Sequence, residues 1–280
     1  MIKIALPNKG MLFEPALSLF KACGYKVSKT RKTLSSTDPE NGVEFFFLRP
    51  DDIPMYVGKG IIDAGVTGVD FEAEAGSLCE KVLDLGFCKS RHFAAVPDKS
   101  DISSLEQLRD KRIATSYPGI VENYFGSPCP EIIPLTGAVE ISVSLGVADA
   151  VVDVVETGTT LKQAGLRILG EPLFSSQAAL FAHPGRSLLP DLLTLKKRLE
   201  GKLVATAWMM VEYDVNADTL EKACAVTPGL SSPTVSPLYN KGWFAVKAMV
   251  KKNESNLVMD KLSDLGCKGI LLTSIESARI

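Results

Sequence analysis

The sequence predicts an α/β protein with a two-lobed core followed by a separate, small ferredoxin-like domain. Short apolar strand segments alternate with helical segments up to about residue 202, as in sheets covered by helices. From residue 203 the predicted order becomes β-α-β-β-α-β, which is typical of a ferredoxin-like module. The 280 residues are 46% hydrophobic and 23% charged, enough apolar material for more than one core.

The first series of elements begins with the apolar strand "IKIAL" at 2–6. A helix is predicted over 11–23, because apolar residues recur on one face and Gly24 follows. Strands at 43–49 and 61–68 enclose a short helix in "DDIPMYVGKG", and another strand is predicted at 82–87.

The second series has the same alternation. Its predicted helices are 104–110, 121–125 and 138–148, and its predicted strands are 92–96, 112–116, 131–135, 149–155, 166–169 and 177–183. Strands joined by helices of this length predict parallel sheets. A leucine-rich helix at 187–202 closes the series.

The third series begins with a long predicted strand, "LVATAWMMVEYDV", and a helix capped at Asn216 or Asp218. The strands "SPTVSPL" and "GWFAVKAMV" enclose a hairpin turn at 239–242. A helix ending at Gly266 and the strand "ILLTSI" complete the module.

Composition argues against several classes of protein. A formal net charge of −2 predicts no nucleic-acid partner, and no apolar run is long enough for a membrane span or a signal peptide, so we expect a cytoplasmic protein. Six cysteines without C-x-x-C spacing and only two histidines argue against a zinc site and favour free thiols.

Polar residues and glycines follow several predicted strands. They include the segments "PNKG" at 7–10, "RPD" at 49–51, "TGVD" at 67–70 and "SYPG" at 116–119. Ligands of open α/β sheets bind beyond the carboxyl ends of the strands, so these segments are candidates for one binding site. Any single loop of this kind is also explained by the polarity of ordinary loops.

The segment "VVDVVETGTTL" at 151–161 carries the most specific signal. Asp153 interrupts an apolar strand, and Thr157-Gly158-Thr159-Thr160 follows as a turn that opens a helix. Backbone N–H groups and hydroxyls in such a turn suit a phosphate, and a nearby carboxylate suits sugar hydroxyls. The pattern predicts a cradle for a ribose 5-phosphate.

From Glu140 to Leu161 the chain reads E-x5-G-x-A-x2-V-x-D-V-x2-T-G-x-T-L, which resembles the signature of the ATP phosphoribosyltransferase family. The segments "PNKG", "VEFFFLRPDDI", "DAGVTGVD", "TPGLSSPT" and the C-terminal module extend the resemblance to the long form of this enzyme. It implies a periplasmic-binding-protein-like core of the type IV phosphoribosyltransferase kind. It also implies transfer of 5-phosphoribosyl from phosphoribosyl pyrophosphate to N1 of ATP, the first step of histidine biosynthesis.

The resemblance assigns roles to residues at matching positions. Glu140 and Asp153 would hold the ribose hydroxyls, and Thr157, Gly158, Thr159 and Thr160 the 5-phosphate. The ATP side would be formed by Lys9, Arg49, Thr67, Gly68, Asp70 and Tyr117, with Lys9 and Arg49 beside the pyrophosphate. The implied catalytic residues are Lys9, Arg49, Glu140 and Asp153. Magnesium is the expected cofactor, held mainly by substrate phosphates rather than by a protein metal site.

Other interpretations of single residues stay open. Asp153 could be a helix cap or part of a surface pair, Arg49 could pair with Asp51 or Asp52, and Tyr117 could be ordinary packing. Glu156 occupies a free position of the signature. Because a second carboxylate beside a phosphate would be repelled, we expect its side chain to turn away.

The resemblance also implies the domain organisation. Residues 1–91 and 177–202 would form the first lobe, 92–176 the second lobe with the phosphoribosyl-pyrophosphate loop, and 203–280 a regulatory domain. Feedback inhibition by histidine would involve Asp214, Leu230, Ser232, Thr234 and Gly269, and self-association into dimers or hexamers is expected. The alternatives are an oligomerisation domain without a histidine site and, for the whole chain, a non-catalytic two-lobed binding protein.

Overall fold

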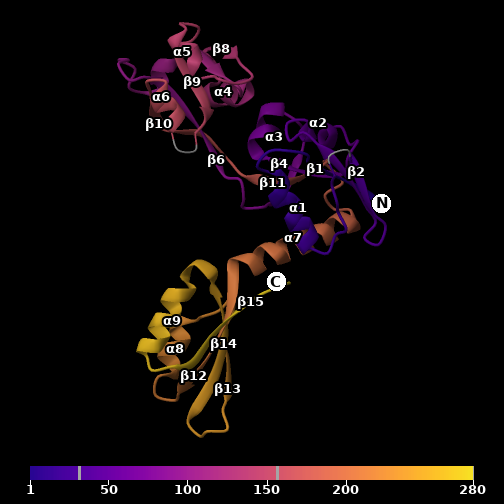
Figure 1. Ribbon diagram of the computed structural model, residues 1–280, viewed down its shortest axis with the longest axis vertical. Coiled ribbons are helices and arrows are strands. Elements are labelled where there is room, and N and C mark those ends of the chain that lie inside the picture. The colour runs from indigo at the N-terminus through magenta and orange to yellow at the C-terminus, as the bar shows by residue number, and fades with distance from the viewer. Residues whose placement is uncertain (31–32, 156–157, 280) are drawn as a thin grey trace. The chain divides into compact units, whose positions relative to one another are not determined.

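The structure is a computed structural model that describes residues 1–30, 33–155 and 158–279. The chain forms two compact units, Met1–Leu193 and Thr194–Ile280. The first contains two sheets and the second contains one, each with helices against it (Figure 1). The predicted α/β class, with a two-lobed core and a small C-terminal sheet domain, is confirmed.

The first lobe is built on a six-stranded sheet in the order β2-β3-β1-β4-β11-β5. The bounds are β1 Ile2–Pro7, β2 Ser35–Asp38, β3 Val43–Leu48, β4 Ala64–Gly68, β5 Glu80–Asp84 and β11 Ala178–Ala182. Its helices are α1 Phe13–Ala22, α2 Ile53–Gly58 and α3 Val69–Ala75. Strands β3, β1 and β4 run parallel, so their carboxyl ends lie at one edge.

The second lobe is built on a five-stranded sheet in the order β10-β6-β9-β7-β8. The strands are β6 Ser90–Pro97, β7 Arg112–Thr115, β8 Glu131–Pro134, β9 Ala150–Val154 and β10 Leu166–Ser176. The helices are α4 Pro118–Phe125, α5 Ile141–Ser144 and α6 Thr159–Gln163, with a 3-10 turn, η1, at Leu105–Leu108. The chain enters this sheet between β5 and β6 and returns to the first sheet between β10 and β11.

Apolar residues cover both faces of the second sheet. One face carries a buried cluster that includes Val96, Ile113 and Val152, and the other carries Val151, Leu161 and Leu166. Successive residues of a strand point to opposite faces, which is why neighbours such as Val151 and Val152 belong to different clusters.

The C-terminal unit has a four-stranded antiparallel sheet in the order β13-β14-β12-β15, with α8 and α9 on one face (Figure 1). The bounds are α7 Pro190–Ala207, β12 Trp208–Asn216, α8 Leu220–Val226, β13 Thr234–Pro237, β14 Trp243–Lys251, η2 Lys252–Glu254, α9 Ser255–Asp264 and β15 Lys268–Ser274. Tyr213, Val246 and Leu262 are buried in its core. The buried Tyr213 hydroxyl is hydrogen-bonded to Thr227 Oγ1 at 2.8 Å.

Several predicted elements differ from the structure. The sheets are mixed, because β11 runs antiparallel to β4 and β6 runs antiparallel to β9. The strand predicted from residue 203 begins only at Trp208, since α7 continues to Ala207. The helix predicted over 138–148 is limited to Ile141–Ser144, and β2 was not predicted.

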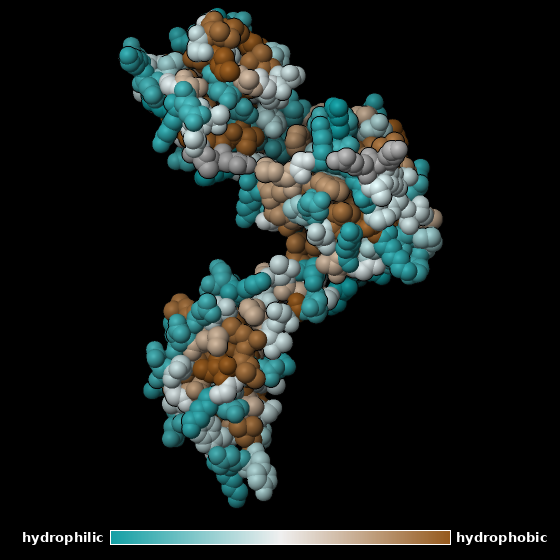
Figure 2. Space-filling view, viewed as in Figure 1, coloured by the Kyte–Doolittle hydropathy of each residue, from teal (hydrophilic) through white to brown (hydrophobic). Residues whose placement is uncertain are grey.

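Hydrophilic side chains are spread over the visible surface of each unit and surround smaller hydrophobic areas (Figure 2). Among the described residues, no helix has the length and apolar character needed to cross a membrane.

Candidate active site

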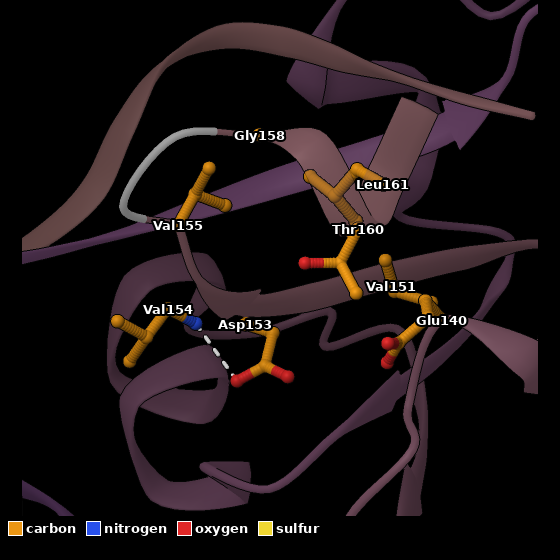
Figure 3. A pocket seen from close by; sticks show the side chains of 8 residues that line it. All are labelled: Glu140, Val151, Asp153, Val154, Val155, Gly158, Thr160 and Leu161. Atoms are coloured by element: carbon orange, nitrogen blue, oxygen red, sulfur yellow. Dashed lines mark hydrogen bonds between the residues drawn. The ribbon is translucent and has the colours of Figure 1, made fainter. Parts of the chain in front are cut away.

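A cavity of about 280 Å³ lies at the carboxyl end of β9. Its lining comes from the end of β9, from the start of α6 and from Glu140 immediately before α5. The carboxyl groups of Glu140 and Asp153 and the hydroxyl of Thr160 are directed into the same space (Figure 3). These are three of the residues predicted to form the ribose-phosphate cradle.

Strand geometry places Asp153 in this cavity. β9 lies between β6 and β7, with Asp153 opposite Phe93, and strand alternation puts Asp153 on the same face as Val151. The Val154 N–H donates to Asp153 Oδ1 at 2.7 Å. Asp153 therefore lies near the end of a strand, half-buried, and is neither a helix cap nor a member of an ion pair recorded for the described residues.

The electrostatics of the cavity disfavour the ionised form of Asp153 beside Glu140. Burial raises the pKa of the Asp153 carboxyl, and the charge of Glu140 raises it further. The cavity lining contains these two carboxylates and no cationic side chain among the described residues. A ligand with hydroxyl donors compensates such carboxylates, because each hydroxyl can donate to an oxygen that burial has removed from water.

Gly158 has φ +71°, in the left-handed region that glycine adopts without strain. It precedes α6, whose first residues are Thr159 and Thr160, so the predicted turn does open a helix. Thr157 and Glu156 lie outside the described residues. The predicted orientation of Glu156 stays a prediction.

The first lobe brings Lys9 and Arg49 to one sheet edge. They follow the parallel neighbours β1 and β3, in which Pro7 is opposite Leu48. Both side chains are exposed. No ion pair of Arg49 with Asp51 or Asp52 is recorded in the described part of the chain. The Arg49 carbonyl accepts the backbone N–H groups of Asp52 and Ile53 and so begins the turn into α2.

Thr67, Gly68 and Asp70 lie where β4 passes into α3. The buried Thr67 hydroxyl donates to the Pro50 carbonyl at 2.6 Å and thereby fixes the turn after Arg49. At Gly68 a Cβ would lie 2.1 Å from Asp70 Oδ1, so only glycine leaves space for the buried Asp70 carboxylate.

Three residues that the sequence did not single out surround Asp70. The Asp70 N–H donates to Ser176 Oγ at 3.0 Å, and Ser90 Oγ donates to Asp70 Oδ2 at 3.5 Å. The fully buried His92 has Nε2 3.9 Å from the same carboxyl oxygen, and burial lowers the pKa of His92. These residues lie on β6 and β10, and no spacing in the sequence links them to Asp70.

Tyr117 lies against this group from the second lobe. Its ring meets the His92 ring edge-on at 4.5 Å between centroids, and its N–H donates to Thr115 Oγ1. Burial raises the pKa of Tyr117, and the nearby carboxylates, Asp70 first, raise it further. Tyr117 is half-buried, so packing against His92 accounts for only part of its surface.

A carboxylate also joins the two lobes. The Glu74 carboxylate on α3 accepts the backbone N–H groups of Gly119 and Ile120 in the first turn of α4, each at 3.1 Å. Burial raises the pKa of Glu74, while these two hydrogen bonds lower it.

Comparison with known proteins gives the family. Residues 49–201, more than half of the chain, match the model described as ATP phosphoribosyltransferase, and residues 205–277 match the model described as HisG, C-terminal domain. The chain belongs to the ATP phosphoribosyltransferase family. The ATP phosphoribosyltransferase of Pseudarthrobacter chlorophenolicus is 45% identical over 285 residues, and that of Corynebacterium jeikeium 46% over 282, with full coverage of both chains in each case.

A solved structure from Thermotoga maritima is also similar. It is described as an ATP phosphoribosyl transferase (HisG:HisZ) complex, and the matched chain is 28% identical with a TM-score of 0.61. The match covers 71% of this chain and 97% of that one. Family membership supports a phosphoribosyltransferase, and not the alternative of a non-catalytic binding protein.

ATP phosphoribosyltransferases use a divalent metal ion. Among the described residues, no group of three or more His, Cys, Asp or Glu side chains is placed to hold a metal ion. The nearby carboxylates of Glu140 and Asp153 are oxygen ligands of the type that hard divalent ions prefer, and their mutual repulsion favours a cation.

The residues that the resemblance implies for histidine binding belong to the C-terminal unit of the chain. Asp214 on β12 is close to Gly269 on β15, where a Cβ would lie 3.6 Å from Asp214 Oδ2. Thr234 begins β13, and Leu230 and Ser232 lie in the exposed loop before it. The structure thus brings Asp214 and Gly269 together, and among the described residues no hydrogen bond or ion pair joins them to Leu230 or Ser232.

Proposed function

We propose that the chain transfers the 5-phosphoribosyl group of phosphoribosyl pyrophosphate to N1 of the adenine of ATP, in the first step of histidine biosynthesis. A bond forms between N1 and C1 of the ribose, and the bond between C1 and the pyrophosphate oxygen breaks, so that pyrophosphate leaves with the electron pair. The observation that carries the proposal is the cavity at the end of β9, where two carboxylates face a glycine-threonine turn.

In this proposal the second lobe binds the sugar phosphate. Glu140 and Asp153 accept hydrogen bonds from the ribose hydroxyls, and the turn formed by Thr157, Gly158, Thr159 and Thr160 receives the 5-phosphate. The half-buried position of Asp153 supports this role, because a buried acceptor is stabilised by any donor that a ligand brings. Binding fixes C1 in the orientation that attack requires.

The first lobe would bind ATP and the leaving group. Lys9 and Arg49 would place positive charge beside the pyrophosphate and triphosphate, which favours the departure of an anion. Asp70 with Gly68 would line the nucleotide side, Thr67 would fix the turn that carries Arg49, and Tyr117 would stack on the adenine. The hydrogen bond from Ser90 Oγ to the Asp70 carboxylate and the one from the Asp70 N–H to Ser176 Oγ support a fixed residue at this position.

Magnesium is the divalent ion that we propose. It would be held mainly by pyrophosphate oxygens and water, with Glu140 and Asp153 as the nearest protein carboxylates, and it would neutralise charge on the departing pyrophosphate.

For residues 203–280 we propose a regulatory role. Histidine would bind as a feedback inhibitor at Asp214, Leu230, Ser232, Thr234 and Gly269, with the acid pairing to a positive group of the ligand and the hydroxyls bonding its carboxylate. Self-association into dimers or hexamers would accompany this role. The adjacency of Asp214 and Gly269 supports the ligand set.

The proposal is tested by incubating the protein with ATP, phosphoribosyl pyrophosphate, Mg²⁺ and pyrophosphatase, and following the absorbance of an N1-substituted adenine. Wild type is expected to form the product. Gly158→Val is expected to lose it, because a β-branched residue does not tolerate φ +71° in the phosphate turn. Gly165→Val, at φ +69° outside the cavity, is the control for strain alone. No product with wild type would refute the reaction, and a fully active Gly158→Val would refute the turn.

A further inference from the structure

A second cavity, of about 620 Å³, lies beside the cradle on the strands that join the lobes. Its lining is Lys89, Ser90, Arg91, Val155, Ser175, Ser176 and Gln177. Two cations and several hydroxyl and amide groups line it, and no acidic side chain does so among the described residues. Val155 lines the cradle as well, so the two cavities are neighbours.

Neither cation has an anionic partner among the described residues. No ion pair or side-chain hydrogen bond is recorded for Lys89 or Arg91 within the described ranges, and the guanidinium of Arg91 lies over the Phe93 ring, 5.4 Å from its centroid. By contrast, Lys251 in the cationic cavity beside Trp208 is already paired with Glu254 at 3.7 Å. Unpaired cations at a cavity wall favour an anionic ligand.

The register of β6 places Arg91 on the cradle side of the sheet. Phe93 is opposite Asp153, and Arg91, two residues before Phe93, shares its face. The Val155 N–H donates to the Arg91 carbonyl at 2.9 Å, so Arg91 is adjacent to the last described residue before the phosphate turn. Arg91 thus lies on the face of the sheet that carries Asp153, and its backbone contacts the segment that leads into the turn.

The cradle itself lacks the charge that a phosphate dianion requires. Its described lining has two carboxylates and no cation, and α6 is only five residues long, so its dipole contributes little. We infer that Arg91, with Lys89, binds the 5-phosphate of the phosphoribosyl substrate from the second cavity and supplies the positive charge that the cradle lacks. The inference rests on the proposed function and assigns two further residues to its sugar-phosphate site.

The test uses titration calorimetry of the full chain with two ligands, ribose 5-phosphate and phosphoribosyl pyrophosphate. Arg91→Gln is expected to weaken both by a similar factor, about tenfold for the loss of one exposed charge-assisted hydrogen bond. Arg91→Lys is expected to recover part of the loss, and Lys89→Gln to show a smaller effect. Lys99→Gln changes an exposed lysine two residues beyond the far end of β6; it is the matched control and is expected to bind as wild type.

Two outcomes would overturn the inference. Unchanged affinity of Arg91→Gln for ribose 5-phosphate would exclude a contact with the 5-phosphate. Weakening of phosphoribosyl pyrophosphate alone would place Arg91 at the pyrophosphate instead. Asp153→Ala separates these results from the proposed function, since its loss of phosphoribosyl-pyrophosphate binding is expected whether or not Arg91 takes part. The far-ultraviolet circular dichroism of each variant shows that it is folded.

Discussion

When no ligand is bound, the ionised Asp153 carboxylate lowers the stability of the folded protein. Its folded-state pKa is raised by burial and by the charge of Glu140, so the folded protein binds a proton at this group more tightly than the unfolded chain does. The ionised group therefore destabilises the fold at neutral pH, and this destabilisation disappears as the pH falls below the ordinary aspartate range. A ligand that donates hydrogen bonds to the Asp153 carboxylate offsets this destabilisation.

Asp153→Asn is accordingly expected to raise the melting temperature at neutral pH by up to a few degrees and to weaken phosphoribosyl-pyrophosphate binding by about tenfold or more. Differential scanning calorimetry and titration calorimetry measure the two effects. The stability gain should vanish near pH 3. A variant that is less stable than wild type at neutral pH would contradict the assigned electrostatics.

Glu140→Gln tests whether the charge of Glu140 contributes to the raised pKa of Asp153. Removing the neighbouring charge should shift the carboxyl titration of Asp153, followed by NMR, to lower pH. An unmoved midpoint would leave burial as the sole cause of the raised pKa.

The site residues that could be predicted from the sequence are those that lie close together along the chain. Asp153 and Gly158 share one short segment in which the chain itself sets their distance. Ser90, His92 and Ser176 surround Asp70 only because β6 and β10 return to the end of β4, and a single sequence contains no sign of that proximity.

Among the elements, β4 and α2 pack closely enough to exclude any side chain at Gly65. A Cβ there would lie 2.6 Å from Ile53 Cγ2 and 3.1 Å from the Ala5 Cβ. The same contact holds α2 against the sheet, directly after the turn that carries Arg49.

Gly65→Ala is therefore expected to destabilise the protein by about 1 to 3 kcal/mol, because α2 must move away from the sheet. Urea unfolding measures the change, and a raised KM for ATP is expected from the displaced Arg49 turn. Gly137→Ala, where a Cβ would meet nothing within 4 Å, should leave both quantities unchanged. Equal stability of the two variants would show that α2 adjusts without loss.

Element boundaries that sequence reasoning missed have identifiable causes. The β-branched Val204 and Thr206 favour a strand, but both lie in the last turns of the helix that begins at Pro190, where tertiary context overrides the local preference. The strand predicted over 166–169 continues as β10 to Ser176 through a shift in register between Leu169 and Phe174, and Gly170 and Pro172 lie within this irregular stretch.

The short α5 has a different cause. Ser142 Oγ donates to the Val139 carbonyl and Ser144 Oγ to the Ile141 carbonyl, three residues back in each case. Such side-chain bonds compete with continued helix formation. The spacing of apolar residues over 138–148 predicted a full helix, because that spacing carries no information about serine side chains bonding to the backbone.

At the scale of the whole molecule, the proposed separation of catalysis and regulation is testable with one substitution. Asp214→Ala is expected to weaken inhibition by histidine by about tenfold or more while the rate without histidine stays unchanged. Initial rates over a range of histidine concentrations measure this. Asp218→Ala removes an exposed acid of the same unit and should be inhibited as wild type.

Histidine inhibition that is unchanged in Asp214→Ala would refute the proposed ligand set. A shortened chain ending at Ala207 keeps α7 intact and should be insensitive to histidine; continued inhibition of that chain would place the inhibitor site in the first unit.

The division into a two-lobed core and a terminal α/β module could be predicted because each series of elements is regular in the sequence. The mixed direction of the sheets could not, since it depends on where the chain returns after leaving a sheet. β11 lies between β4 and β5 and runs antiparallel to both. The apolar residues 178–182 are equally compatible with a parallel or an antiparallel strand.

The connection between the lobes has a mechanical consequence. Where the chain leaves and re-enters the first lobe, β6 and β10 are paired strands, with Ser90 opposite Ser176 and Arg91 opposite Ser175. A two-stranded ribbon can bend out of its own plane while its hydrogen bonds stay intact. Sliding one strand along the other would break all the hydrogen bonds between them. We therefore expect the lobes to rotate about this ribbon rather than to slide along it, so that an attacking nitrogen bound to one lobe would approach the sugar carbon along the same line at each turnover.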